Sequence, residues 1–378
     1  MERRIIMKIT LNTEELKEKL TLAKGVSSGK NMVMPTQAHC LIEVKEKAGS
    51  IFATDTDIAV NLPLSVEETE GEITLCLHTG MLYDIVKTIE SETVTIETVN
   101  SDQVLLRAGK SKFKLNCSDP EMYPHWEDPV YSGDVHTVVL PAKRLLEMID
   151  KTIFAAGDND VRYTLNSLLF HIEPDWFRLV GTDGNRLALI TDFSAETPTL
   201  KDPIKAIVPK RACQELKKLL KEDGNVQITV TEKIAWFLLE NGISFMTRTI
   251  EGTYPSYENV IPNYENMATI SRDSLLKALK LSSIVASEDS GRVTIKGETG
   301  AIEVKAEAPV GNYSDTIEDI YGEIPKEVSF NFKYLLDAIS RMEGDNIYYR
   351  FNPEEELTPI VITGDDTDFL YVFMPLRQ

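Results

Sequence analysis

Acidic residues gather at two predicted turns, and paired carboxylates are groups that could perform acid–base or metal chemistry. Asp55 and Asp57 are two residues apart, and the run Gly364–Asp368 contains three aspartates. Acidic residues that follow strands more often form turns and stay solvated. The five histidines have no metal-ligand spacing, and no phosphate-binding glycine-rich loop occurs. We therefore expect no catalytic residues, no metal and no cofactor, with a carboxylate-pair hydrolase as an alternative.

The composition is that of a soluble globular protein without a membrane segment. With 378 residues, of which 42% are hydrophobic and 26% charged, the chain is long enough for two or three domains. No run of 18 apolar residues occurs, and the N-terminus is too short and polar for a signal peptide. The four cysteines are isolated, as in reduced proteins. We expect a cytoplasmic protein whose first strand begins near Met7. The sequence leaves open whether residues 1–6 belong to the native protein.

The net charge of −20 is unevenly distributed. The six segments with helical patterns contain 17 Lys and Arg against 14 Asp and Glu, a net charge of +3. The remainder of the chain therefore carries −23. A general preference of helix surfaces for lysine would also explain the difference. An acidic chain with weakly basic helices favours a nucleic-acid partner only if those helices share one surface.

Three stretches of about 120 to 130 residues repeat the same order of elements, which indicates a triplicated domain. The predicted helices are Asn12–Val26, His78–Ser91, Leu140–Gly157, Val208–Asp223, Ile270–Ser287 and Phe330–Asp345. Two short echoes keep this spacing. Ala53-Thr54-Asp55 matches Gly181-Thr182-Asp183, and Glu121–Pro124 matches Gly252–Pro255. Triplicated domains suit a symmetric assembly better than an enzyme, which usually needs one copy of its site.

Strand patterns fill the sequence between these helices. Residues 94–99 alternate with period two, turn at 100–102 and return over 103–107, and similar hairpins follow at 226–238 and 293–305. Hairpins imply antiparallel sheets, so the predicted class is α+β with two helices in each domain. Turn-rich segments near 128–136 and 261–269 predict domains at 7–128, 136–260 and 262–378.

Five motifs together resemble the bacterial sliding-clamp family, the beta subunits of DNA polymerase III, over residues 7–378. The motifs are Met7-Lys8-Ile9-Thr10, Asp160-Val161-Arg162-Tyr163 with Leu165-Asn166, Gly181-Thr182-Asp183-Gly184 with Arg186-Leu187-Ala188, Ile207-Val208-Pro209-Lys210 and Tyr371–Pro375 with Arg377. The resemblance implies the DNA-clamp fold, with three similar domains and two chains joined head to tail in a ring. Such a ring encircles and slides on duplex DNA as the processivity factor of the replicative polymerase. It contacts phosphates without reading bases.

The resemblance also implies three sets of site residues. The DNA-contacting residues would be Lys30, Asn159, Tyr163, Lys210 and Arg211. A pocket for short hydrophobic peptides would contain Arg162, Leu165, Thr182, Gly184, Arg186, Leu187, Pro255, Val260, Leu357, Val372, Met374, Pro375 and Leu376. The dimer interface would join Phe113 to Ile284 and Val285. Thr164 and Asn185 stand where many relatives have Tyr and His, which predicts a reshaped pocket rim.

The implied partners are a second copy of the chain, duplex DNA of any sequence, the DNA polymerase III catalytic subunit, the clamp loader and other proteins with a clamp-binding motif. No membrane partner is expected. One alternative is an acidic three-domain scaffold that binds proteins but never encircles DNA. A ring differs from such a scaffold because topological linkage keeps the polymerase at high effective concentration without a tight protein–DNA bond.

Overall fold

The computed structural model describes residues 7–27, 35–126, 136–197, 200, 203–220, 223–231, 233–286, 291–318, 320–323, 327–355 and 357–377. These residues form two compact units. The first takes its residues from 1–145, 196–200 and 211–249, and the second from 146–195, 201–210 and 250–378. The division runs through the middle repeat, and the predicted domain limits stay predictions. Every strand pairing that involves a named strand is antiparallel, and the predicted α+β class is confirmed.

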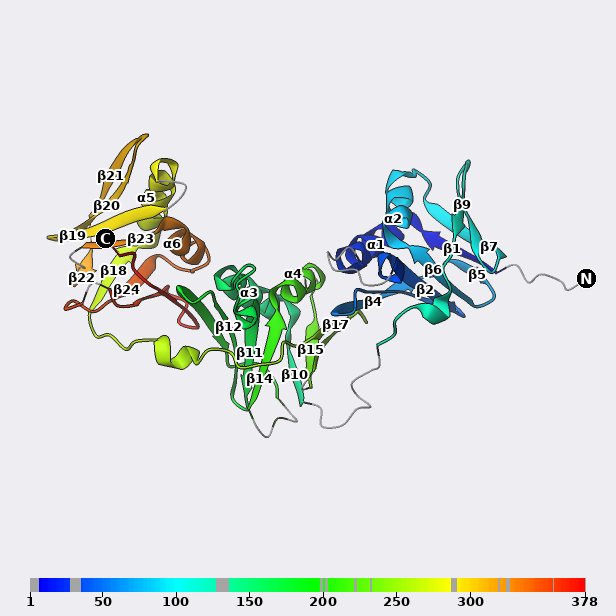
Figure 1. The fold of residues 1–378 in the computed structure, drawn as a ribbon, viewed down its shortest axis with the longest axis horizontal. Helices are drawn as coiled ribbons and strands as arrows, with labels where there is room; N and C mark the ends of the chain where they lie inside the picture. Colours follow the sequence, from blue (N-terminus) through cyan, green and yellow to red (C-terminus); the bar gives the residue numbers. More distant parts are fainter. Residues whose placement is uncertain are drawn as a thin grey trace, which may run out of the picture. The chain divides into compact units, whose positions relative to one another are not determined.

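The first unit contains two sheets (Figure 1). The five-stranded sheet has the order β5 (Glu68–Glu70), β1 (Lys8–Asn12), β7 (Thr93–Asn100), β8 (Gln103–Ala108) and β9 (Ser111–Asn116). The eight-stranded sheet has the order β10 (His136–Pro141), β15 (Asn225–Val230), β16 (Ile234–Leu239), β17 (Ser244–Arg248), β4 (Ile58–Ser65), β3 (Ala48–Thr54), β2 (His39–Lys45) and β6 (Ile73–His78). Helix α1 (Thr13–Ser27) packs on α2 (Thr79–Thr88) and on β3 and β4. Helix α4 (Lys210–Leu219) follows β14.

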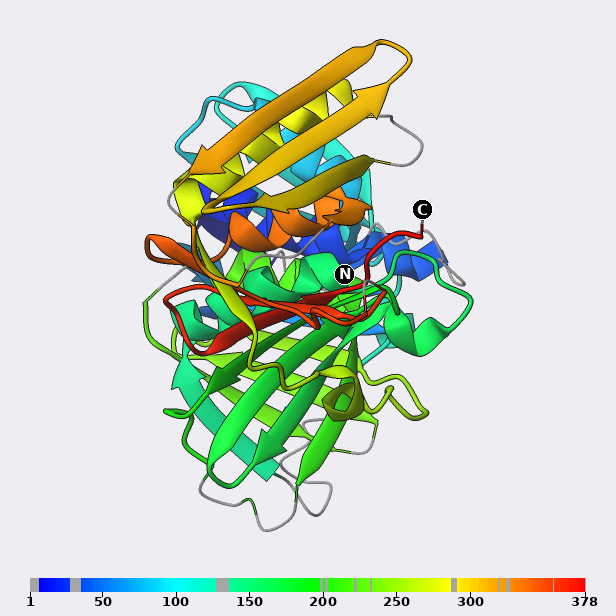
Figure 2. The ribbon, with the colours of Figure 1, turned by 90° about the vertical axis from the view of Figure 1, so that its left-hand side faces the viewer.

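The second unit also contains two sheets. The nine-stranded sheet has the order β14 (Ile204–Pro209), β11 (Ser167–Glu173), β12 (Trp176–Thr182), β13 (Arg186–Asp192), β26 (Phe369–Phe373), β25 (Ile360–Thr363), β24 (Asn346–Arg350), β18 (Met267–Ser271) and β22 (Tyr321–Gly322). The four-stranded sheet has the order β21 (Gly311–Glu318), β20 (Ala301–Ala308), β19 (Arg292–Glu298) and β23 (Glu327–Asn331). Helix α5 (Arg272–Val285) lies against β20 and β21 (Figure 2) and also packs on α6 (Phe332–Ile339). Helix α3 (Ala142–Thr152) continues into the 3-10 turn Ile153–Ala155.

Five of the six helices are shorter than the sequence predicts, in part because the first residues of each predicted segment belong to the preceding strand. Helix α1 keeps its predicted length of 15 residues and begins one residue later. Pro141 and Pro209 end β10 and β14 instead of opening α3 and α4. Proline can occupy the last residue before a helix because its fixed φ suits both elements. None of the described helices is both long and apolar enough to cross a membrane.

The Thr-Asp echo in the sequence corresponds to a repeated turn. The Thr54 hydroxyl donates to the carbonyl oxygen four residues later at 2.8 Å, and the Thr182 hydroxyl does the same at 2.6 Å. The Asp55 carboxylate accepts from the N–H groups two and three residues later, at 3.1 and 2.9 Å. Asp183 makes the same two bonds at 2.9 and 3.1 Å. Each turn therefore satisfies several of its own backbone groups before it leads into the next strand.

The tyrosines of the second echo fasten these turns. The Tyr123 hydroxyl donates to the His39 carbonyl oxygen at 2.8 Å and accepts from the Thr54 N–H at 3.1 Å. The Tyr254 hydroxyl donates to the Val180 carbonyl oxygen at 3.2 Å. Burial raises the pKa of both hydroxyls, so both stay protonated at neutral pH. In the first two repeats, a buried tyrosine thus lies against the Thr-Asp turn or the strand that leads into it.

Candidate functional site

The second unit contains a pocket of about 520 Å³ beside the turn that joins β12 to β13. The 3-10 turn η6 (Tyr257–Val260) and the last strand, β26, form its other sides. Its lining residues are Arg162, Leu165, Thr182, Gly184, Asn185, Arg186, Leu187, Pro255, Ser256, Tyr257, Asn259, Val260, Pro262, Pro359, Val372, Phe373 and Met374. A pocket of this size fits a few side chains of a peptide or a small molecule.

The floor of the pocket is apolar and fixed. Leu187, Tyr257 and Val372 are buried there and belong to one core cluster that spans β11 to β14, β25 and β26. Val260 and Met374 are exposed at the mouth. A rigid floor favours large apolar groups, whereas the flexible thioether of methionine can adapt to ligands of different shape.

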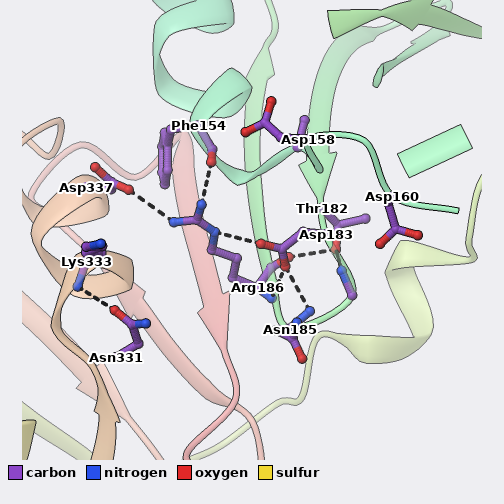
Figure 3. Close-up of polar contacts among 12 residues, drawn as sticks. Phe154, Asp158, Asp160, Thr182, Asp183, Asn185, Arg186, Asn331, Lys333 and Asp337 are labelled. Atoms are coloured by element: carbon purple, nitrogen blue, oxygen red, sulfur yellow. Dashed lines mark hydrogen bonds and ion pairs between the residues drawn. The ribbon is translucent and has the colours of Figure 1, made fainter. Parts of the chain in front are cut away.

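Arg186 holds one side of the pocket in place (Figure 3). Its Nε donates to Asp183 at 3.0 Å, Nη1 to Asp337 on α6 at 3.1 Å, and Nη2 to the Phe154 carbonyl oxygen at 2.7 Å. The guanidinium carbon also lies 4.5 Å from the centre of the Tyr334 ring. These contacts occupy the whole planar fork, so Arg186 joins β13, α6 and the end of α3 as a structural hub.

Arg162 has a different environment at the rim. It forms a bidentate pair with Asp160, at 3.1 and 2.9 Å, and donates to the Asp183 carbonyl oxygen at 3.0 Å. This pairing lowers the pKa of Asp160. Gly184 has φ +90°, and a Cβ there would lie 2.9 Å from the Arg162 guanidinium. Glycine is required because it permits the left-handed turn and leaves room for the arginine.

Ten of the thirteen pocket residues that the resemblance implies line this pocket, whereas Leu357, Pro375 and Leu376 do not. After Met374, the tail runs beside β23, where the Leu376 N–H donates to the Ser329 carbonyl oxygen at 2.7 Å. The resemblance did not assign Ser256, Tyr257, Asn259, Pro262 or Pro359 to the pocket, although Tyr257 follows the Tyr254 echo by three residues. Asn185 lines the pocket as its rim position predicts, and Thr164 does not.

Two of the three cations predicted to contact DNA, Lys210 and Arg211, are already paired with carboxylates. Lys210 Nζ lies 2.8 Å from Asp158 and donates to the Ala156 carbonyl oxygen at 2.9 Å. In the first unit, Arg211 pairs with Asp55 and donates to the Val26 carbonyl oxygen at 3.3 Å. These pairs weaken the local positive potential.

The other predicted DNA-contacting residues lie in a surface loop or outside the described structure. Asn159, with φ +58°, and Tyr163 are exposed in the same loop of the second unit. Lys30 lies outside the described residues. All five roles stay predictions.

The residues predicted for the dimer interface lie on two different exposed features. Phe113 belongs to β9, an edge strand, and lines a groove of about 1070 Å³ between α2 and the β8–β9 hairpin. Ile284 is 76% exposed at the end of α5, where Val285 is half-buried. The contact between these features stays a prediction.

The acidic turns perform structural roles. Asp365 accepts from the Asp345 and Asn346 N–H groups at 2.8 and 3.2 Å and from the Tyr348 hydroxyl at 2.9 Å. Asp366 lies 2.8 Å from the buried Lys151 ammonium. Within the described ranges, no group of three or more His, Cys, Asp or Glu side chains could hold a metal ion. These carboxylates therefore stabilise turns and one ion pair, and they do not converge on a shared site.

The first unit carries a related turn with different surroundings. The Arg248 N–H donates to the Asp57 carbonyl oxygen at 2.8 Å, as the Met374 N–H donates to the Asn185 carbonyl oxygen at 2.9 Å. The Arg248 side chain donates to the Thr56 carbonyl oxygen at 2.9 Å and lies over the Trp126 ring at 5.6 Å. A tethered arginine thus occupies the position that corresponds to the adaptable Met374.

Comparisons with known proteins cover almost the whole chain. Residues 7–127, 139–256 and 258–377 match the family models of the N-terminal, central and C-terminal domains of the DNA polymerase III beta subunit. The Beta sliding clamp of Pseudomonas aeruginosa is 27% identical over 376 residues, 98% of this chain and 100% of that protein. The Beta sliding clamp of Bacillus subtilis is 27% identical over 387 residues, with the same coverage.

Solved structures are similar over the same length. The Bacillus subtilis DNA polymerase sliding clamp has a TM-score of 0.90 and 26% identity, and the match covers 98% of this chain and 99% of that one. The Pseudomonas aeruginosa DnaN sliding clamp bound to griselimycin has a TM-score of 0.90 and 25% identity, with coverage of 98% and 100%. The similarity therefore extends to the fold of all three repeats.

The two pocket arginines should differ in their effect on stability. Arg186 is 14% exposed and Arg162 is 59% exposed. Arg186→Lys should lower the free energy of unfolding by about 2–4 kcal/mol, because lysine cannot keep the buried fork of hydrogen bonds. Arg162→Lys, the matched control, should leave urea denaturation nearly unchanged. Equal losses in the two variants would contradict the role of Arg186 as a structural hub.

Proposed function

The chain belongs to the DNA polymerase III beta-subunit family, the bacterial sliding clamps, and from this premise we propose how its own residues act in a processivity factor of the replicative polymerase. A ring of two chains encircles duplex DNA, and the pocket of the second unit tethers the partner proteins. The observation that carries this proposal is the apolar pocket beside Gly184, since it combines a buried floor with an adaptable mouth. Topological linkage of the ring to DNA then keeps the polymerase near its template without tight binding between protein and DNA.

The pocket would receive a short hydrophobic peptide segment. Leu187, Tyr257 and Val372 offer apolar surface for one or two large side chains, and Met374 can adjust to different partners. The similar sliding clamp of Pseudomonas aeruginosa has been solved bound to griselimycin, so a clamp of this fold can hold a ligand. The DNA polymerase III catalytic subunit, the clamp loader and other proteins with a clamp-binding motif would compete for this site. A small transient contact of this kind has a Kd of about 1 µM, or about −8 kcal/mol.

Ring closure would join the first unit of one chain to the second unit of its partner. The groove beside Phe113 offers apolar walls from Met81 and Ile85, and Ile284 of the partner subunit would insert there. The contact is heterologous, and in a two-chain ring it closes by rotation. Burial of the exposed isoleucine supplies the main stabilisation.

The charges of the two edge strands are complementary. Strand β9 carries Lys112 and Lys114, and the edge strand β21 carries Asp315 and Glu318. Strands with free edges can pair with another chain, and opposite charges favour this heterologous pairing over pairing of like edges. The same charges would oppose a symmetric contact between two first units.

Contact with DNA would be weak and independent of sequence. Lys210 and Arg211 lie at the start of α4, where their carboxylate partners leave only part of their charge available to phosphates. Binding by phosphate neutralisation falls steeply with salt. Such contacts allow sliding because no base is read.

The proposed interface predicts that Ile284→Lys converts the dimer into monomers. The change removes apolar area and would bury a charge in the groove. Phe193→Lys is the matched control, since Phe193 is 71% exposed but directly follows β13, outside the proposed interface. Light scattering should report monomers for the first variant and dimers for the second. A dimeric Ile284→Lys protein would show that the interface lies elsewhere.

The proposed pocket predicts that Val260→Lys weakens binding of a short hydrophobic peptide at least about tenfold, because it places a charge at an apolar mouth. Leu357→Lys is the matched control. The two residues are 51% and 52% exposed, but only Val260 lines the pocket. Calorimetry with a peptide from the clamp-binding segment of the polymerase catalytic subunit measures the difference. Unchanged affinity in Val260→Lys would refute the pocket assignment, and a loss in Leu357→Lys would extend the site to the loop between β24 and β25.

A further inference from the structure

The loop at residues 156–166, which leads into β11, forms part of one side of the pocket. Arg162 and Leu165 on this loop both line the pocket, and Leu165 is buried. The base of the loop is closed, because the Gly157 N–H donates to the Leu165 carbonyl oxygen at 2.8 Å. The Leu165 N–H donates in turn to the Arg162 carbonyl oxygen at 2.8 Å. The two lining residues are therefore fixed to each other and to the first residues of the loop.

Lys210, the first residue of α4, binds both ends of this loop. At the start of the loop, its Nζ donates to the Ala156 carbonyl oxygen at 2.9 Å and lies 2.8 Å from the Asp158 carboxylate. At the end of the loop, its backbone N–H donates to the Asn166 carbonyl oxygen at 2.9 Å. The Lys210 side chain is 13% exposed, and charge-assisted hydrogen bonds are strong where the cation is shielded from water.

Hydrogen bonds inside the loop connect this anchor to Arg162. The Asn166 side chain accepts from the Asp160 N–H at 2.8 Å and donates to the Asp160 carbonyl oxygen at 2.9 Å. The Asp160 carboxylate then accepts from the Arg162 N–H at 2.8 Å, in addition to its bidentate pair with the guanidinium. An unbroken series of contacts therefore runs from Lys210 through Asn166 and Asp160 to the arginine at the pocket rim.

The lysine occurs only in the repeat whose loop lines the pocket. The second helices of the first and third repeats, α2 and α6, begin with Thr79 and Phe332 instead. Neither side chain carries a charged donor that could bridge a carbonyl oxygen and a carboxylate. The repeated fold therefore forms without an ammonium at this position, which indicates that Lys210 serves the loop and not the helix that it begins.

We propose that Lys210 is a positioning residue of the peptide pocket, which holds the loop at 156–166 so that Arg162 and Leu165 keep their places in the pocket wall. The proposal rests on the proposed peptide-binding function. A loop that is fixed before the ligand arrives loses less conformational freedom on binding, and affinity rises accordingly. Lys210 thus has a task at the pocket that is separate from any contact of its ammonium with DNA.

Loss of the ammonium should loosen the loop without removing any residue of the pocket. Lys210→Met keeps an unbranched side chain of similar length but cannot donate to Ala156 or pair with Asp158. The backbone bond from residue 210 to Asn166 is retained, so only the start of the loop is released. Peptide binding must then order this segment again, which should weaken affinity about three- to tenfold, the effect of one net hydrogen bond.

The test measures the Kd of an end-blocked peptide with two leucines and one phenylalanine, by calorimetry on the full-length chain. Lys210→Arg is the conservative variant, because a guanidinium can donate to the same oxygen atoms. Asp158→Asn removes the charge of one partner at a position that is 77% exposed, so folding is not at risk. Lys218→Met is the matched control, since Lys218 lies on α4 but pairs with Glu215 in the first unit.

Lys210→Met should bind about three- to tenfold more weakly than wild type, whereas Lys210→Arg and Lys218→Met should stay within about twofold. Asp158→Asn should weaken binding less, and the double variant with Lys210→Met should bind no more weakly than Lys210→Met alone, because both changes act on one contact. Hydrogen exchange should show faster exchange of the Gly157 and Leu165 amides in Lys210→Met, since these amides close the loop.

Unchanged peptide affinity in Lys210→Met would overturn the positioning role. A loss of affinity without faster exchange in the loop, or additive losses in the double variant, would overturn it as well, because Lys210 would then act by another route. An equal loss in Lys218→Met would show a general effect of the charge. Failure of the wild type to bind the peptide would instead contradict the proposed pocket function.

Discussion

The structure depends on one constraint, which is that the strand after each Thr-Asp turn pairs with the last strand of the next repeat. In the second unit, β13 pairs with β26, and Arg186 lies opposite Phe373. The last strand must therefore end beside the turn at Gly184, and the pocket forms where these segments meet. A buried tyrosine and the fork of Arg186 then fix the turn from behind. The pocket is thus a consequence of how the repeats join, and no separate element is needed to build it.

The same junction occurs in the first unit, where β4 pairs with β17, but the side chains differ. Arg248 is tethered over Trp126 at the position that corresponds to Met374. The repeats therefore share one backbone arrangement, and a few side chains that differ between them determine their function. This logic favours a clamp over an acidic interaction scaffold, since the match to sliding clamps extends over all three repeats.

Local patterns were sufficient to predict the repeats, the hairpins, the α+β class and the turn at Asp55, and the echo at Thr182 indicated that this segment recurs. Ten pocket residues followed from the motifs of the resemblance. Tyr257 and Pro359 were not found in this way, because they lie outside the motifs and meet the other lining residues only in the folded chain. The pairing of Arg211 with Asp55 was equally hidden, since 156 residues separate them. Sequence patterns predict the structure of a single helix, strand or turn, whereas these contacts depend on how whole repeats pack together.

The central claim is that two chains close into a ring held on DNA by topology. The most direct test loads the protein with a clamp loader onto nicked circular DNA and then cuts the circle with a restriction enzyme. Gel filtration in moderate salt should show the protein travelling with the circle and leaving once the DNA is linear, because phosphate contacts alone are too weak to retain it. Equal retention on circular and linear DNA would contradict encirclement.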